Sequence, residues 1–154
     1  MICSDTIRLA NINDSFCIAE MSRDLIESGL GWSWTPSRVA REITEKCSNV
    51  IVTVEGDDIL GFGVMKYSDC EARLNLFAVH PTYRRKGIGT RMIKWLEKTA
   101  LIYGSSVVYL EMRLRNQAAR EFYTSLGYEE IQRVPGYYKQ RETAVRMAHD
   151  LWSD

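Results

Sequence analysis

Apolar residues recur along this chain with a helical period in some stretches and with strict alternation in others, which predicts a mixture of helices and strands. The first helix is indicated by apolar residues at roughly helical spacing, namely Phe16, Ile18, Ala19, Leu25 and Ile26. We expect Asp14 to cap this helix and Gly29 to mark its end. A second helix is predicted after Trp34, because Thr35 suits the N-cap and Pro36 the first helical position.

Short apolar or β-branched runs predict strands at Thr6–Leu9, Val50–Val54, Ile59–Tyr67, Leu74–Val79, Val107–Leu110, Tyr128–Arg133 and Thr143–Asp150. The turn sequence Glu55-Gly56-Asp57-Asp58 predicts that the second and third runs form a hairpin. A long helix is indicated by one apolar face made of Ile88, Met92, Trp95, Leu96 and Ala100. A shorter helix is expected over Gln117–Leu126, where Gly127 stops it.

The predicted order is β-α-α-β-β-β-α-β-α-β-β, which is typical of an α+β fold with helices packed on one central sheet. No repeat, low-complexity tract or linker-like stretch interrupts the 154 residues, so we expect a single domain over residues 1–154. The hydrophobic fraction of 45% and the charged fraction of 26% are those of an ordinary globular protein.

The charges balance, with 20 Lys and Arg against 20 Asp and Glu, so no net charge favours nucleic acid or an anionic membrane as a partner. The four cysteines are scattered and form no CxxC pair, which predicts no metal site and reduced thiols that serve as small hydrophobic residues. The amino end lacks a signal-peptide pattern, and no window approaches the ~18 apolar residues of a membrane span. We therefore expect a cytoplasmic protein; its oligomeric state cannot be inferred from the sequence.

The most informative stretch runs from Leu76 to Thr90, where an apolar strand leads through a basic loop into a helix. The first turn of a helix carries unpaired N–H groups and the positive end of the macrodipole, which favour an anion. Gly87 and Gly89 allow a pyrophosphate to approach the backbone, and three basic residues can donate charge-assisted hydrogen bonds: Arg84, Arg85 and Lys86. The alternative is a solvated basic turn, but the glycines and the strand–loop–helix context favour phosphate.

Two other phosphate loops are excluded by their patterns. A Walker loop requires GxxxxGK[ST], which this chain lacks. A dinucleotide fingerprint would require a third glycine at Met92 and a tight turn in place of the long basic loop.

The motif Arg84-x-x-Gly87-x-Gly89 resembles the acetyl-CoA motif of the GNAT superfamily of N-acetyltransferases. The resemblance continues through Leu110–Arg113, Asn116–Ala119 and Phe122–Tyr128, and the segments after Gly136 are similar to those of bacterial ribosomal-protein alanine N-acetyltransferases. It implies a GNAT-like α+β domain in which about four helices flank a mixed sheet of about seven strands. It also implies an enzyme that transfers the acetyl group of acetyl-CoA to an amine.

The resemblance also implies roles for individual residues. The backbone of Phe77, Ala78 and Val79 would bind the pantetheine arm. The residues that would wrap the pyrophosphate are Arg85, Lys86, Gly87, Ile88, Gly89 and Thr90, with Arg84 beginning the motif. Asn116 would hydrogen-bond the cofactor near its thiol end.

Glu111 stands where the family places a general base, and Tyr123 where it places a general acid. An amine attacks a thioester only when neutral, and an α-amine has a pKa of about 7.7–8.0, so a carboxylate that removes its proton is useful. A phenol can protonate the departing thiolate. The structural alternatives are a salt bridge from Glu111 to Arg113 or Arg115 and a buried packing role for Tyr123. No cysteine has a convincing histidine partner, so an acetyl-cysteine intermediate is not expected.

The acceptor residues are expected at Trp34, Tyr137 and Tyr138. Trp34 lies between the first two helices, where the superfamily often shapes its acceptor site; alternatively it packs on Val39 as a hydrophobic staple. The resemblance places the two tyrosines in a hairpin over the acceptor, where their hydroxyls could bind a peptide backbone. A protein N-terminus is therefore the expected acceptor. The alternatives are a small amine, such as a polyamine or an amino-sugar, and a non-catalytic acyl-CoA-binding domain.

Overall fold

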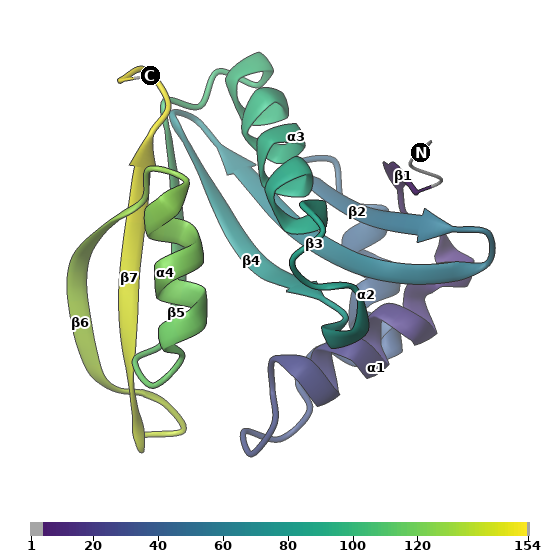
Figure 1. Cartoon of the computed structure of the whole chain (residues 1–154), viewed down its shortest axis with the longest axis horizontal. Helices are drawn as coiled ribbons and strands as arrows, with labels where there is room; N and C mark the ends of the chain where they lie inside the picture. Colours follow the sequence, from purple (N-terminus) through teal and green to yellow (C-terminus); the bar gives the residue numbers. More distant parts are fainter. Residues whose placement is uncertain (1–4, 154) are drawn as a thin grey trace. The chain divides into compact units, whose positions relative to one another are not determined.

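The computed structural model describes residues 5–153, and in that range it has the predicted order of elements (Figure 1). Seven strands form one mixed sheet with the order β1-β2-β3-β4-β5-β7-β6. The strands are β1 (Thr6–Leu9), β2 (Ser48–Glu55), β3 (Asp58–Ser68), β4 (Glu71–Val79), β5 (Val107–Arg113), β6 (Glu129–Tyr138) and β7 (Glu142–Asp150). The helices are α1 (Ser15–Leu25), α2 (Pro36–Ile43), α3 (Ile88–Ile102) and α4 (Gln117–Ser125), with 3-10 turns η1 (Ile12–Asp14) and η2 (Pro81–Tyr83). The predicted α+β class is confirmed.

The chain divides into two compact units, which we describe separately. The first contains residues 5–66 and Leu76–Leu96. Its strands β1, β2 and β3 are antiparallel neighbours, and Glu55 pairs with Asp58 at the predicted hairpin. Its core contains Ile18, Ala19, Met21, Trp34, Val39, Val50, Val52, Phe62, Val64, Leu76 and Ala78.

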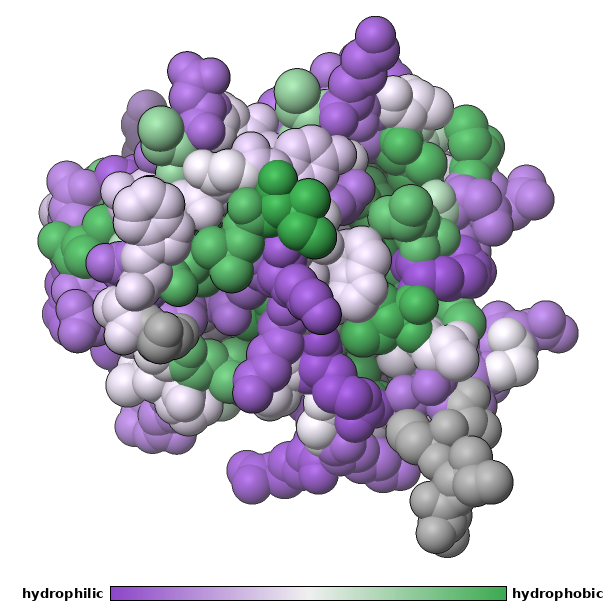
Figure 2. Space-filling view, turned by 90° about the horizontal axis from the view of Figure 1, so that it is seen from above, coloured by the Kyte–Doolittle hydropathy of each residue, from purple (hydrophilic) through white to green (hydrophobic). Residues whose placement is uncertain are grey.

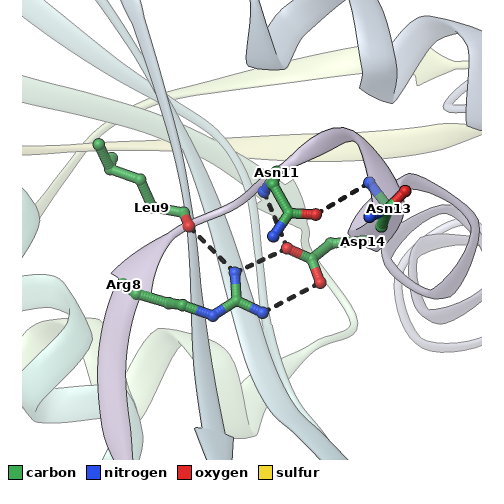
Figure 3. Close-up of polar contacts among 5 residues, drawn as sticks. All are labelled: Arg8, Leu9, Asn11, Asn13 and Asp14. Atoms are coloured by element: carbon green, nitrogen blue, oxygen red, sulfur yellow. Dashed lines mark hydrogen bonds and ion pairs between the residues drawn. The ribbon is translucent and has the colours of Figure 1, made fainter. Parts of the chain in front are cut away.

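Helix α1 differs from the sequence prediction in its face and in its cap. Phe16 is 61% exposed, whereas Met21 and Ser22 are buried. Asp14 occupies the N-cap position, but its side chain makes no capping hydrogen bond to α1. Instead its carboxylate accepts two hydrogen bonds from the Arg8 guanidinium, at 2.7 and 3.1 Å, and one from the Asn11 N–H at 2.8 Å (Figure 3). The Asp14 carboxylate therefore ties β1 to the start of the helical segment.

The second unit contains Tyr67–Asn75 and residues 97–153. Strand β4 pairs in parallel with β5, and the register ends at Leu74 and Leu110. Strand β7 pairs antiparallel with β5 on one side and with β6 on the other (Figure 1). Buried and partly exposed residues alternate along β5, so every second side chain faces the core: Val108, Leu110 and Met112.

Surface residues include large apolar side chains, such as Ile102 at 78% and Trp152 at 75% exposure. Hydrophobic and hydrophilic groups are interspersed over the face drawn in Figure 2. The free thiols of Cys17, Cys47 and Cys70 are also exposed, so the expectation that they act as buried hydrophobic residues is wrong for these three; Cys3 lies outside the described residues. Within residues 5–153, no helix is long and apolar enough to cross a membrane.

Candidate active site

The basic loop lies in the first unit and connects η2 to α3. Arg84, Arg85, Lys86 and Gly87 are all exposed, so the cationic groups face solvent. Arg85 has φ +65° and Gly87 has φ +79°, a left-handed backbone that turns the chain sharply before the helix. The loop therefore presents positive charge and a side-chain-free turn at one place.

The first turn of α3 supplies N–H groups beside this loop. The Arg91 N–H donates to the Gly87 carbonyl at 3.1 Å, which is the first hydrogen bond of the helix. The N–H groups of Ile88, Gly89 and Thr90 precede it and have no carbonyl acceptor within the helix. The Ile88 side chain is only 2% exposed and anchors this turn in the core. Ile88 can therefore contact an anion only through its backbone N–H, not through its side chain.

Phe77, Ala78 and Val79 lie at the end of β4, beyond the last residue that pairs with β5. Their backbone groups on that edge are thus outside the β4–β5 ladder. The Val79 carbonyl is engaged by the loop itself, because it accepts a hydrogen bond from Arg84 Nε at 3.0 Å. This contact fixes the exit of the strand relative to the basic loop.

Trp34 also lies in the first unit, in a segment held by one buried carboxylate. Thr35 caps α2 as predicted, and Trp34 is 8% exposed in the same core cluster as Val39. Glu27 accepts hydrogen bonds from the Ser33 N–H and hydroxyl at 2.7 and 2.6 Å, from the Ser22 hydroxyl at 2.8 Å, and from the Trp34 N–H at 3.3 Å. Burial would raise the pKa of Glu27, but these hydrogen bonds together hold it below its ordinary value.

Glu111 lies on β5 in the second unit, and its side chain is 10% exposed. Arg73 Nη1 contacts both carboxylate oxygens, at 2.6 and 2.7 Å, and Arg146 Nε lies 3.4 Å from Oε2. The salt-bridge alternative expected Arg113 or Arg115, but those two guanidinium groups pair with Glu142 instead, at 3.7 and 3.1 Å. The β5–β7 register explains this difference, since Arg146 lies directly opposite Glu111, whereas Arg113 lies opposite Ala144.

Two predicted site residues, Tyr137 and Glu111, are in direct contact, and Tyr138 packs beside Tyr137. The Tyr137 hydroxyl donates to Glu111 Oε1 at 3.3 Å, and the Tyr137 and Tyr138 rings pack edge to face with centroids 4.9 Å apart. Burial is the main cause that raises the pKa of both phenols, and the charge of Glu111 adds to it. Both hydroxyls therefore remain protonated donors at neutral pH.

Helix α4 carries the other two predicted residues of the second unit. The Asn116 side-chain oxygen caps the helix by accepting from the Ala119 N–H at 3.1 Å, which leaves the amide N–H groups as its donors to a ligand. Tyr123 is 7% exposed, and burial raises the pKa of its phenol. Its ring packs edge to face between Phe122 and Tyr128, at 5.1 and 5.5 Å.

Sequence reasoning did not find Glu27, Arg73 or Arg146. The two arginines could have been proposed from strand alternation, because both lie on the same face of the sheet as Glu111. Nothing in the sequence around Glu27 distinguishes it from a solvated acid. Among the described residues, no group of three or more His, Cys, Asp or Glu could hold a metal ion.

Solved structures of other proteins share this fold. Ard1 from Thermoplasma volcanium superposes with a TM-score of 0.82 at 26% identity, over 96% of this chain and 98% of its own. The PaiA N-acetyltransferase from Thermoplasma acidophilum, solved with coenzyme A, has a TM-score of 0.79 at 18% identity, over 96% and 99% of the two chains, and shares the fold. These two likenesses show the fold.

The sequence matches the acetyltransferase (GNAT) family over residues 18–128, and the chain belongs to that family. Ribosomal protein bS18-alanine N-acetyltransferase of Escherichia coli is 31% identical over 118 residues, which are 75% of this chain and 79% of that protein. An N-alpha-acetyltransferase of Sulfurisphaera tokodaii is 39% identical over 75 residues, 48% and 45% of the two lengths. An uncharacterised Mycobacterium leprae protein is 30% identical over 109 residues, 68% of this chain but 30% of that protein. The chain therefore spans less than half the length of two of these three curated relatives.

Proposed function

We propose that this chain transfers the acetyl group of acetyl-CoA to the α-amine of a protein N-terminus. The observation that carries the proposal is the contact between Tyr137 and Glu111, because it joins an expected peptide-binding residue to the expected base. The names of the relatives in Escherichia coli and Sulfurisphaera tokodaii support the same acceptor class.

The basic loop and the first turn of α3 would bind the pyrophosphate of acetyl-CoA. The exposed cations and the left-handed turn at Gly87 suit an extended anion, which needs both charge and close backbone donors. The strand end Phe77–Val79 would hydrogen-bond the pantetheine arm through its backbone. Asn116 would donate its amide N–H near the thiol end.

In the chemical step the neutral amine nitrogen forms a bond to the acetyl carbon, and the bond from that carbon to the CoA sulfur breaks. Glu111 takes the amine proton, directly or through one water. Tyr123 donates its phenolic proton to the departing thiolate, and its buried phenol keeps that proton until then. Arg73 holds the Glu111 carboxylate in a fixed orientation during this transfer.

A polypeptide acceptor is favoured over a small amine by the paired tyrosines. A peptide offers amide groups beyond its first residue, and the hydroxyls of Tyr137 and Tyr138 can hydrogen-bond them while the rings cover the chain. Trp34, in the first unit, stays a candidate acceptor residue. An acceptor without backbone amides would gain nothing from these contacts.

The test is the variant Tyr138→Ala, compared with Tyr103→Ala, which removes an exposed tyrosine ring after α3 in the same unit. Tyr138→Ala should raise KM for an acceptor peptide several-fold and leave acetyl-CoA binding unchanged, whereas Tyr103→Ala should change neither. Slow acetylation of a polyamine should also remain unchanged. Equal loss of peptide and polyamine activity in Tyr138→Ala would contradict a peptide acceptor and favour a small amine.

A further inference from the structure

A partly buried carboxylate in the second unit connects three elements. Glu97 Oε2 on α3 accepts a hydrogen bond from the Tyr128 hydroxyl at 2.8 Å and lies 2.7 Å from His149 Nδ1 on β7. Because the carboxylate oxygen can only accept, the short contact places a proton on His149 Nδ1. The side chains of Glu97 and His149 are 15% and 4% exposed, and Tyr128 is 1% exposed. These three residues are called the Glu97 network below.

The Glu97 network lies directly against the end of α4. The Tyr123 carbonyl accepts the N–H of Leu126 and the N–H of Tyr128, both at 3.0 Å, so Tyr128 is bonded to the backbone of Tyr123. Gly127 between them has φ +99°, and a Cβ there would stand 2.8 Å from His149 Nε2. The helix end can therefore approach the His149 ring this closely only because residue 127 is glycine.

Ring contacts also link Tyr123 to the Glu97 network. The Tyr128 ring packs edge to face on Tyr123 at 5.5 Å, and on its other side it meets the His149 ring at 5.0 Å. Burial and the charge of Glu97 raise the pKa of Tyr128, so its hydroxyl stays a donor to that carboxylate. If the Glu97 carboxylate lost the hydrogen bond from the Tyr128 hydroxyl, it would take another donor, and the Tyr128 ring would move.

We propose that Glu97, Tyr128 and His149 are positioning residues, which hold Tyr123 in the orientation from which it protonates the leaving thiolate. This inference rests on the proposed function, in which Tyr123 is the general acid. The Glu97 network has no atom that needs to touch a substrate. It acts by fixing the backbone and the ring of Tyr123.

The first test is Tyr128→Phe, which removes the hydroxyl and keeps the ring. A misplaced catalytic group can lower the rate by up to roughly a hundredfold, so kcat should fall about tenfold or more while KM for acetyl-CoA stays the same. In a Tyr123→Phe background, Tyr128→Phe should cause no further loss of kcat, because Tyr128 acts through the Tyr123 phenol. Tyr103→Phe, which removes an exposed hydroxyl after α3, is the control and should leave kcat unchanged. Losses that multiply in the double variant would overturn the proposal.

A second pair of variants covers the case in which Tyr128→Phe fails to fold. In His149→Asn the amide nitrogen takes the place of Nδ1 and can donate to Glu97, so kcat should be largely retained. In His149→Leu the donor is lost, and kcat should fall as in Tyr128→Phe. Equal activity of the two variants would contradict a positioning role.

A readout independent of turnover separates this inference from the proposed function. With 3-fluorotyrosine incorporated, the ¹⁹F resonance of Tyr123, assigned by its absence in Tyr123→Phe, should shift in Tyr128→Phe and His149→Leu and stay in place in Tyr103→Phe. An unmoved resonance would overturn the positioning role whatever the activity. A wild-type protein without acetyl transfer, or a fully active Tyr123→Phe, would instead remove the proposed function while the resonance still reports on the network.

Discussion

Replacing Glu27 with glutamine tests whether one carboxylate holds the segment that carries Trp34. Glu27 is 7% exposed and accepts hydrogen bonds from Ser22, Ser33 and Trp34. Glutamine has nearly the same size but turns one acceptor oxygen into a donor. The amide nitrogen cannot accept, so at the Oε2 position it leaves the Trp34 N–H with Oε1 alone, and the Ser22 hydroxyl keeps its contact only by turning to accept.

The magnitude follows from these contacts. A hydrogen bond to a charged group contributes about 1.5–3 kcal/mol, and a buried donor left without an acceptor costs about 1–3 kcal/mol. Because Glu27→Gln weakens several such bonds and leaves part of the set satisfied, we expect it to lower the free energy of unfolding by about 2–4 kcal/mol. The loss should depend on pH, since the folded pKa of Glu27 lies below its unfolded value. The stabilisation is then present above the unfolded pKa and is lost as the pH falls through the folded pKa.

The measurement is urea unfolding of both proteins, followed by tryptophan fluorescence at several pH values. The difference between wild type and Glu27→Gln should be constant from about pH 6 to pH 8 and shrink below roughly pH 4. Glu20→Gln is the matched control, because Glu20 lies on α1 with its side chain 43% exposed, and it should change stability by less than about 0.5 kcal/mol. A Glu27→Gln protein as stable as Glu20→Gln, or a difference that grows as the pH falls, would refute the role given to this carboxylate.

Three further predictions concern the loop, the base and the first strand. Coenzyme A at a hundredfold excess over Kd should stabilise the wild type by about 2.7 kcal/mol. In Gly87→Val the left-handed turn is lost, so coenzyme A should no longer raise Tm. An equal Tm shift in both proteins would contradict the loop assignment. Glu111→Gln should lower kcat/KM most near neutral pH and less above about pH 9, where the α-amine is neutral without a base; an unchanged pH–rate profile would return Glu111 to a structural ion pair. Asp14→Asn should lower the free energy of unfolding in urea by about 1 kcal/mol or less, since the side chain of its partner Arg8 is 40% exposed. A larger loss would contradict a weak contribution from this ion pair.

Local signals predicted the elements and several of their ends. Thr35 caps α2 with Pro36 at its start, and Gly127 ends α4, as residue preferences require. The sequence prediction ended the sixth strand at Arg133, before Pro135 and Gly136. The structure continues β6 to Tyr138 with a register shift between Val134 and Tyr138. β6 is an edge strand, where a proline is tolerated because its nitrogen can face away from the neighbouring strand.

The contacts of the candidate site depend on residues far apart in sequence, and local patterns do not encode them. The salt-bridge alternative paired Glu111 with its sequence neighbours, whereas the pairing of β5 with β4 and β7 places Arg73 and Arg146 beside it. The Glu97 network likewise joins α3, β7 and the end of α4, and only their packing brings its members together. Tyr123 could be named from the sequence, but the groups that hold it could not.

The most direct test of the proposed function is mass spectrometry of the reaction with acetyl-CoA and a panel of acceptors. The panel should contain a peptide with a free α-amine and a lysine, the same peptide with a blocked α-amine, a polyamine and an amino-sugar. We predict one acetyl group on the α-amine of the free peptide, located by fragmentation, and none on the lysine of the blocked peptide. Acetylation of the polyamine or the amino-sugar without any acetylation of the free peptide would contradict the protein N-terminus as the acceptor.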